Sequence, residues 1–179
     1  MNRVMQFYNY ERCFVYYTNR IMNIRQAKMW GERIVAKPVL LVALIDGIES
    51  NVFQNNHFVI NDWLEERYLN LMCQYTKGSQ FDHPTGIEKP FWHLESDGFW
   101  HLQYPGESLR KNHTPSKAWL KENVRYARFD DDLWFLLQSR EWRMKLREYI
   151  IEHKLTDDTW HSKLAAEGLG VLAALLLAA

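Results

Sequence analysis

The stretch that decides the fold runs Lys89-Pro90-Phe91-Trp92-His93-Leu94-Glu95-Ser96-Asp97-Gly98-Phe99-Trp100-His101-Leu102. Two aromatic arms, residues 91–94 and 99–102, nearly repeat each other on either side of Ser96-Asp97-Gly98. Asp-Gly between strand-like runs is a strong hairpin signal, because glycine accepts the positive φ that tight turns require. The pattern therefore predicts a β-hairpin made from the two arms. A two-stranded hairpin is only marginally stable alone in water, so we expect it to pack against helices.

The composition indicates one globular domain with tails. The chain has 179 residues, of which 47% are hydrophobic and 15% aromatic, and this is enough for a packed core. Eight tryptophans are more than such a core usually buries, so we expect some of them at a binding surface. The 22 basic and 22 acidic residues balance. This balance excludes a uniformly basic nucleic-acid-binding surface but allows a local basic patch.

The cysteines and the two chain ends favour a cytoplasmic location. Cys13 and Cys73 lie far apart without metal-binding spacing, and we expect reduced thiols, with a disulfide as the alternative. Residues 1–21 lack the apolar segment of a secretory signal. The apolar run 168–179 is shorter than the roughly 20 residues that span a bilayer. We therefore expect no membrane partner and interpret this run as a non-native tail, with a shortened tail anchor as the alternative.

A second stretch predicts the central helix. Pro38 is followed by the apolar run Val39-Leu40-Leu41-Val42-Ala43-Leu44-Ile45, and a helix that is hydrophobic nearly all round belongs inside a domain. Lys37 precedes this run, beside the free N–H groups and positive dipole end expected there, where an anion such as phosphate is readily held. The alternative is a solvated lysine at the start of a helix.

Further helices are predicted on both sides of the aromatic stretch. Asn61 is expected to cap a helix from Asp62 to Tyr75, and Asp130 and Ser139 are expected to cap two later helices. Between them, residues 109–128 carry six positive charges against one negative charge, interleaved with aromatic residues. This is the best nucleic-acid-binding pattern in the chain, and a solvated connector is the alternative. The basic residues are Arg110, Lys111, Lys117, Lys121, Arg125 and Arg128.

The residues that usually carry chemistry do not form a known catalytic pattern. His93 and His101 occupy matching places in the two aromatic arms, but no third ligand lies at zinc spacing. We find no phosphate-binding glycine loop, no nucleophile motif and no His-Asn-His nuclease arrangement. The run Asp130-Asp131-Asp132 is better explained by N-capping than by metal binding. We therefore expect a binding module with no catalytic residue, metal or cofactor.

Two separated blocks resemble a known family. Lys37-Pro38 with the leucines that follow, and then Pro90-Phe91-Trp92-His93-Leu94 with Asp97-Gly98-Phe99-Trp100, resemble the N-terminal domain of predicted HNH restriction endonucleases. The same pattern is similar to the sulfur-binding domain of McrA-type enzymes, which recognise phosphorothioate-modified DNA. The resemblance spans roughly Ile24 to Leu155. The family's histidine before the basic residue is Ala36 here, and its tyrosine before the proline is Lys89, so generic DNA-backbone binding is the core of the prediction.

The resemblance implies a DNA-binding role for both blocks. Lys37 would hold the DNA backbone, and an apolar surface around Pro90 and His93 would receive the sulfur, which is large, polarizable and poorly hydrated. The nuclease half of the family is missing from this chain, so we expect no cleavage by this chain alone. The chain would be a stand-alone or a truncated specificity part of an HNH endonuclease, and a nuclease subunit is a candidate partner.

The sequence predicts an α+β fold, a mainly helical domain with a buried central helix and a small β-hairpin that forms a wing. Residues 1–23 would be an N-terminal extension, 24–155 the DNA-binding domain and 156–179 a tail. We predict a DNA-binding specificity module of a modification-dependent restriction system, with double-stranded DNA as its partner. The alternative is a protein–protein interaction module with an exposed aromatic surface. The predicted DNA-binding residues are Lys37, Lys89, Pro90, His93, Lys117, Lys121, Arg125 and Arg128.

Overall fold

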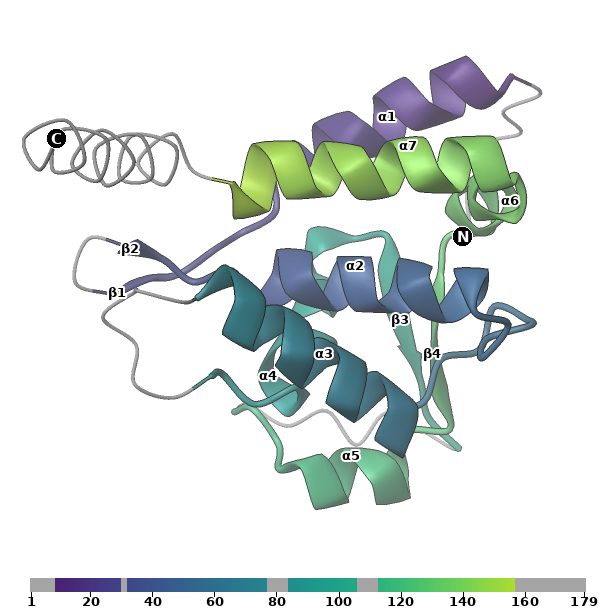
Figure 1. Ribbon diagram of the computed structural model, residues 1–179. Coiled ribbons are helices and arrows are strands. Elements are labelled where there is room, and N and C mark those ends of the chain that lie inside the picture. Colours follow the sequence, from purple (N-terminus) through teal and green to yellow (C-terminus); the bar gives the residue numbers. More distant parts are fainter. Residues whose placement is uncertain (1–8, 30–31, 77–83, 106–112, 157–179) are drawn as a thin grey trace, which may run out of the picture.

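The computed structural model describes residues 9–29, 32–76, 84–105 and 113–156, and these parts form a mainly helical α+β fold (Figure 1). The predicted fold class is confirmed. The elements, in chain order, are α1 (Tyr10–Met22), β1 (Lys28–Met29), β2 (Glu32–Arg33), α2 (Ala36–Glu49), α3 (Asp62–Tyr75), α4 (Glu88–His93), the 3₁₀ helix η1 (Leu94–Asp97), β3 (Trp100–Gln103), α5 (Lys117–Asn123), β4 (Tyr126–Phe129), α6 (Asp131–Gln138), α7 (Arg140–Ile150) and the π-helical turn η2 (Ile151–Leu155).

Helix α2 is the buried centre of the fold, as predicted. It crosses the middle of the molecule between α7 and α3 in Figure 1, and 11 of its 14 residues are buried. An apolar surface on every side suits a helix surrounded by other elements. A Leu→Ala change at such positions typically costs about 2–5 kcal/mol of stability. Gly47 lets α2 approach its neighbours, because a Cβ there would lie 2.6 Å from the Phe53 ring and 3.1 Å from the Trp63 ring.

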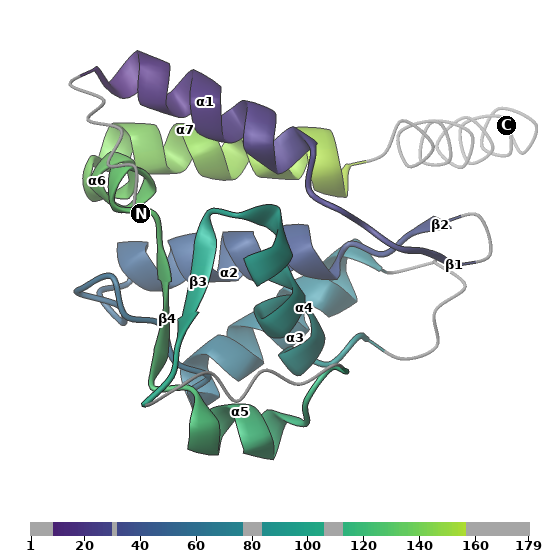
Figure 2. The ribbon, with the colours of Figure 1, turned by 180° about the vertical axis from the view of Figure 1, so that it is seen from behind.

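A second layer of helices covers α2. Helix α1 packs against α6 and α7, and its residues Cys13, Tyr17 and Ile21 are buried in the common core (Figure 2). Residues 10–22 therefore contribute to the packing of the domain, although the sequence analysis separates residues 1–23 as an extension. Where the domain begins and ends stays a prediction, and residues 157–179 lie outside the described part.

The predicted pairing of the two aromatic arms is wrong. Residues 88–93 form helix α4, in which Pro90 lies in the first turn, where its missing N–H costs no helical hydrogen bond. The Asp-Gly pair ends η1 with Gly98 at a φ of 80°, the left-handed conformation typical of a helix C-terminus. Only the second arm is a strand, β3, and it pairs antiparallel with β4 in the register Trp100↔Phe129. The two arms meet through a hydrogen bond from Trp100 Nε1 to the Phe91 carbonyl at 3.0 Å and through an edge-to-face contact between the rings of the same two residues, with ring centroids 5.3 Å apart.

The predicted helix caps have mixed outcomes. Asn61 caps α3 through its Oδ1, which accepts from Leu64 N at 2.9 Å, so this prediction is confirmed. Asp130 and Ser139 occupy the N-cap positions of α6 and α7, but neither side chain caps its helix, so the N-capping explanation of Asp130 is wrong. Its carboxylate instead accepts from Tyr17 OH and bonds His101 Nε2 at 2.6 Å. It therefore ties α6 to α1 and β3.

One of the two cysteines is buried and the other is exposed. Cys13 and Cys73 are both free, as expected for reduced thiols. Burial, followed by the nearby Asp132, raises the pKa of the Cys13 thiol to about 12, so this thiol stays protonated at neutral pH. No helix in the described residues is both long and apolar enough to cross a membrane.

Candidate nucleic-acid interface

Lys37 lies in the first turn of α2 and forms an ion pair with Asp97 at the end of η1. Its Nζ is 2.6 Å from Asp97 Oδ2, and the two side chains are only 11% and 5% exposed. The alternative of a solvated lysine is therefore wrong. Two charges this well covered are stable only when they are paired, so each fixes the position of the other.

Asp97 also organises the end of α1. Its Oδ1 accepts from the backbone N of Arg25 at 3.1 Å, and its carbonyl accepts from the guanidinium of Arg20 at 3.0 Å. Gly98 makes this approach possible, because a Cβ there would lie 2.6 Å from Arg20 Nη2. The Asp-Gly pair thus brings two segments from the start of the chain to the N-terminal end of α2.

Further cations lie beside this carboxylate. Lys154 of η2 donates to the Met22 carbonyl at 2.5 Å and to Gln26 Oε1 at 3.4 Å. Burial lowers the pKa of Lys154, nearby Arg33 lowers it further, and Asp97 partly offsets both effects. We call this group the basic cluster; it comprises five basic residues that are linked to Asp97 directly or through Lys154, and Lys37 is the one whose charged group pairs with the carboxylate. Its members are Arg20, Arg25, Arg33, Lys37 and Lys154.

Lys37 is the only member of the basic cluster among the DNA-binding residues predicted from the sequence. The other four are spread from residue 20 to residue 154, and no periodicity links them. A signal was present only at Asp97-Gly98, which we interpreted as a hairpin turn.

Helix α4 packs against α2 and carries three of the predicted residues. Lys89 is exposed and has no ion-pair partner among the described residues, Pro90 is buried, and His93 is exposed with its Nε2 2.6 Å from Thr114 Oγ1. Partial burial lowers the pKa of His93, Lys37 lowers it further, and Asp97 opposes the shift. His93 is therefore neutral at pH 7 and lies within the field of Lys37. Helix α4 therefore lies beside α2, with His93 near Lys37, and a role of these residues in DNA binding stays a prediction.

The basic stretch 109–128 is less cationic in the structure than in the sequence. Lys117 and Lys121 of α5 both pair with Glu65 of α3, the second at 2.6 Å. Burial raises the pKa of Glu65, but the hydrogen bonds from the two lysines outweigh this effect and lower it overall. These lysines thus hold α5 against α3 in the free protein. Arg110 and Lys111 lie outside the described residues.

The remaining predicted residues lie on or beside β4. Arg128 pairs with Asp131 and lies opposite His101 in the β3–β4 ladder. Arg125 is exposed, without an ion pair among the described residues. Trp119 of α5 packs edge-to-face on Trp92 of α4, with ring centroids 6.1 Å apart. Helix α5 is therefore next to α4 and continues the same surface.

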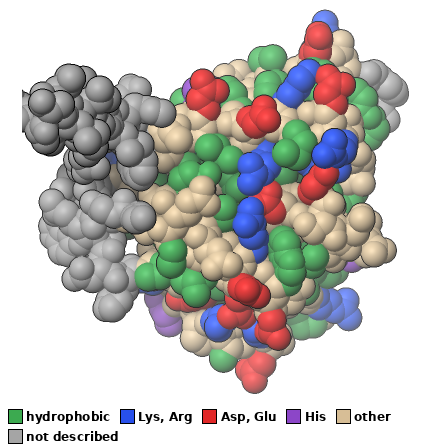
Figure 3. Space-filling view, viewed as in Figure 1, with side chains coloured by type: hydrophobic (Ala, Val, Ile, Leu, Met, Phe, Trp, Pro, Cys, Tyr) green, Lys and Arg blue, Asp and Glu red, His purple; other side chains and the backbone are tan. Residues whose placement is uncertain are grey.

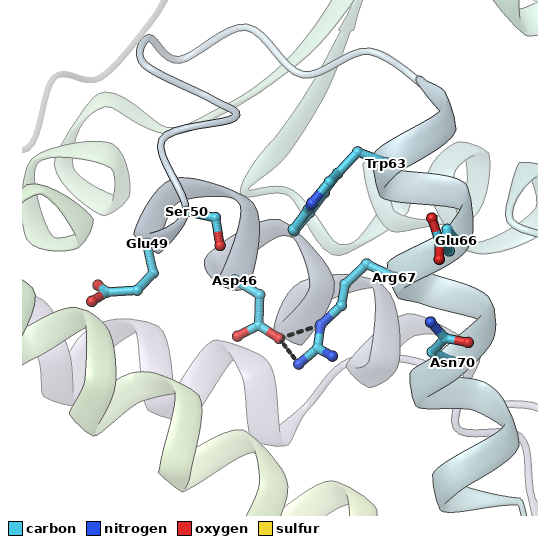
Figure 4. A pocket seen from close by; sticks show the side chains of 7 residues that line it. All are labelled: Asp46, Glu49, Ser50, Trp63, Glu66, Arg67 and Asn70. Atoms are coloured by element: carbon cyan, nitrogen blue, oxygen red, sulfur yellow. Dashed lines mark hydrogen bonds and ion pairs between the residues drawn. The ribbon is translucent and has the colours of Figure 1, made fainter.

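The opposite end of α2 carries a pocket of different character. Its volume is about 430 Å³, and Figure 4 shows Asp46 facing Arg67, with Glu49 and Glu66 also in the lining. Asp46 and Glu49 further pair with three arginines of α7, so acidic and basic side chains alternate on this face in Figure 3. Arginine pairs therefore neutralise Asp46 and Glu49, so this end of α2 is not a strongly acidic surface. Among the described residues, no group of three or more His, Cys, Asp or Glu could hold a metal ion.

A mainly helical domain with a basic cluster at one end of its central helix has the charge pattern of an anion-binding module. The comparison with protein families identifies the anion. The sequence matches the ScoMcrA-like DNA sulfur-binding domain family over residues 17–171, most of the chain, and the chain therefore belongs to this family. It is a DNA-binding module, and the match includes every member of the basic cluster. A comparison with curated proteins finds no match.

Proposed function

We propose that this chain recognises phosphorothioate-modified DNA for a modification-dependent restriction system in the cytoplasm. The observation that carries the proposal is the Lys37–Asp97 pair, which holds a cation of the basic cluster beside α4 in a chain of the sulfur-binding family. Lys37 contacts the sugar–phosphate backbone at the modified linkage, because lysine and arginine contacts to phosphate supply most of the affinity for DNA.

The sulfur meets the α4 surface around Pro90 and His93. Sulfur is larger and less hydrated than oxygen, so it gains from apolar neighbours that would leave a phosphate oxygen without its water. Pro90 is buried and supports this surface from below, whereas His93 is exposed and neutral at pH 7. Lys37 and Lys89 supply positive charge at its rim. The charge of the phosphorothioate is therefore neutralised while its sulfur avoids strongly hydrated groups.

Any cleavage would be carried out by a nuclease outside residues 1–179. The sequence contains no HNH-type arrangement, and the proposal assigns the chain to specificity alone. Purified chain mixed with modified duplex and Mg²⁺ or Mn²⁺ would leave the duplex intact. Metal-dependent cutting by the chain itself would contradict this assignment.

The decisive variants are Lys37→Ala, Lys37→Arg and Lys89→Ala, each titrated with one short duplex with and without a single phosphorothioate. We expect wild type to prefer the modified duplex, Lys37→Ala to lose this preference and Lys37→Arg to retain part of it. Lys89→Ala should weaken binding without unfolding risk, because Lys89 is exposed. Lys145→Ala is the matched control, since Lys145 pairs with Glu141 on its own helix. Equal binding of both duplexes by wild type would contradict sulfur recognition.

A specific observation also favours the protein–protein alternative. Phe135 is 47% exposed and stacks on Tyr10, which stacks on Trp142, so α1, α6 and α7 present an aromatic surface. Partly exposed aromatic residues are typical of protein interfaces. The salt dependence of binding distinguishes the two functions. Affinity for DNA falls steeply between 50 and 200 mM salt, whereas the affinity of an aromatic protein interface changes little.

A further inference from the structure

The short β1–β2 hairpin carries two like charges directly opposite each other. Its register pairs Lys28 with Arg33, and both residues are exposed. Directly opposite residues of an antiparallel pair extend from the same face of the ladder, and like charges in this arrangement destabilise it. The hairpin therefore has an electrostatic cost that an anion between the two side chains would remove.

Lys154 adds a third cation at the base of this hairpin. It donates to Gln26 Oε1, while Gln26 Nε2 donates to the Ile34 carbonyl at 3.1 Å and Ile34 N donates to the Ala27 carbonyl at 2.9 Å. These bonds fix η2 beside the strands. The lowered pKa of Lys154 has Arg33 among its causes, which places the two charges within each other's field.

The described part of the chain does not neutralise these three charges. None of the ion pairs formed within residues 9–29, 32–76, 84–105 and 113–156 involves Lys28, Arg33 or Lys154. Asp97 is already paired with Lys37. In contrast, Lys117, Lys121, Arg128, Arg140, Arg143 and Arg147 all have carboxylate partners. The hairpin is thus a place where the fold leaves cations available for an external anion.

We propose that Lys28, Arg33 and Lys154 form a second DNA contact, which binds unmodified backbone phosphates beside the sulfur-reading surface. This inference rests on the proposed function, because it uses the same DNA molecule. The basic cluster joins the two contacts, since Lys154 lies in the field of both Arg33 and Asp97. A phosphate contact of this kind carries no information about sequence or sulfur. It raises affinity for modified and unmodified duplexes by the same factor and adds to the salt dependence.

The test titrates the full chain with a modified and an unmodified duplex at several salt concentrations between 50 and 200 mM. The variant Lys28→Gln/Arg33→Gln should weaken binding of both duplexes by the same factor, and its salt slope should be smaller by about 2 than that of wild type. The ratio between the two duplexes should stay at the wild-type value. Lys154→Gln should change binding in the same direction with a smaller slope change, about 1.

The matched control is Arg12→Gln/Lys145→Gln, which removes two positive charges at the start of α1 and on α7. A control that weakens binding as much as the hairpin variant would overturn the inference, because net charge alone would explain the loss. Wild-type slope and affinity in the hairpin variant would overturn it as well. Equal binding of the two duplexes by wild type would contradict the proposed function alone. In that case, an equal loss of affinity for both duplexes in the hairpin variant would still support the second contact. Absence of any wild-type binding at 50 mM salt would overturn both.

Discussion

At the scale of single residues, Asp97 controls the geometry of the candidate interface. One residue accepts from Lys37 through its side chain, from the backbone of Arg25, and from Arg20 through its carbonyl. A buried carboxylate of this kind does not itself bind DNA, which it would repel. Its role is to position Lys37 and the end of α1. Measuring both the stability of a variant and its preference for modified DNA distinguishes this role from direct phosphate binding.

Asp97→Asn should lower both stability and the preference for modified DNA. The substitution keeps the shape but leaves the covered Lys37 charge without its partner, and breaking such a pair costs about 3–5 kcal/mol. Urea unfolding measures the loss. Asp131→Asn is the control, because Asp131 is 71% exposed and its pair with Arg128 should contribute about 1 kcal/mol or less. Equal stability of the two variants would contradict the role of Asp97.

His93 should make DNA binding depend on pH. Its pKa in the free protein is below the ordinary value of 6.5, and a bound phosphate would raise it. DNA binding then takes up a proton, so affinity increases as pH falls through the interval between the free and bound pKa values. Titrations at pH 7.5 and 5.5 should show a larger increase for wild type than for His93→Gln. Because the variant keeps every other histidine, identical increases would show that His93 does not face the DNA.

At the scale of secondary-structure elements, local signals predicted α2, α3, α6 and α7, but they missed helices α4 and α5 and gave the wrong strand pairing. The apolar run after Pro38 and the Asn61 cap each act within one or two turns, so sequence is sufficient to find α2 and α3. The Asp-Gly turn is ambiguous, because a left-handed glycine serves a hairpin and a helix end equally well. The partner of β3 lies in β4, more than twenty residues away, where tertiary packing rather than a local turn selects it.

The same limit applies to the interface. Lys37 and the α4 residues stand in recognisable blocks, whereas Arg20, Arg25, Arg33 and Lys154 become neighbours only through the fold. The charges of residues 117–128 suggested a basic surface, but their partners Glu65 and Asp131 come from other elements or from beyond the stretch. Counting charges along a segment does not reveal which of them the fold neutralises.

Glu65→Gln should strengthen DNA binding. The substitution removes the carboxylate that holds Lys117 and Lys121, and α5 lies next to α4, so the released lysines can reach phosphates of the same duplex. We expect tighter binding and a steeper salt dependence, with a slope change of up to about 2. Glu66→Gln makes the same change in net charge one position along α3. An equal gain in both variants would mean that the α5 lysines do not contact DNA.

At the scale of the whole molecule, zero net charge conceals a polarised distribution. The basic cluster lies at the N-terminal end of α2, where Arg33 and Lys154 have no ion pair among the described residues. At the other end of α2, the carboxylates of Asp46 and Glu49 are paired with Arg67 and with three arginines of α7. A molecule of this kind is oriented by the field of DNA before contact, with the basic end leading. The orientation brings α4 and the β1–β2 hairpin to the backbone together, and the end of α2 whose charges are paired faces away from it.

The central claim is that the chain reads sulfur rather than backbone charge, and one measurement tests it most directly. The affinity of wild-type protein would be determined at one salt concentration for three duplexes: unmodified, and carrying either diastereomer of a single phosphorothioate at the same linkage. The backbone charge is the same in all three, and only the direction in which the sulfur projects differs between the diastereomers. The account predicts that one diastereomer binds more tightly than the other two duplexes, since only one orientation directs sulfur to the surface around Pro90 and His93. Equal affinity for all three duplexes would contradict it and leave a general DNA-backbone-binding module.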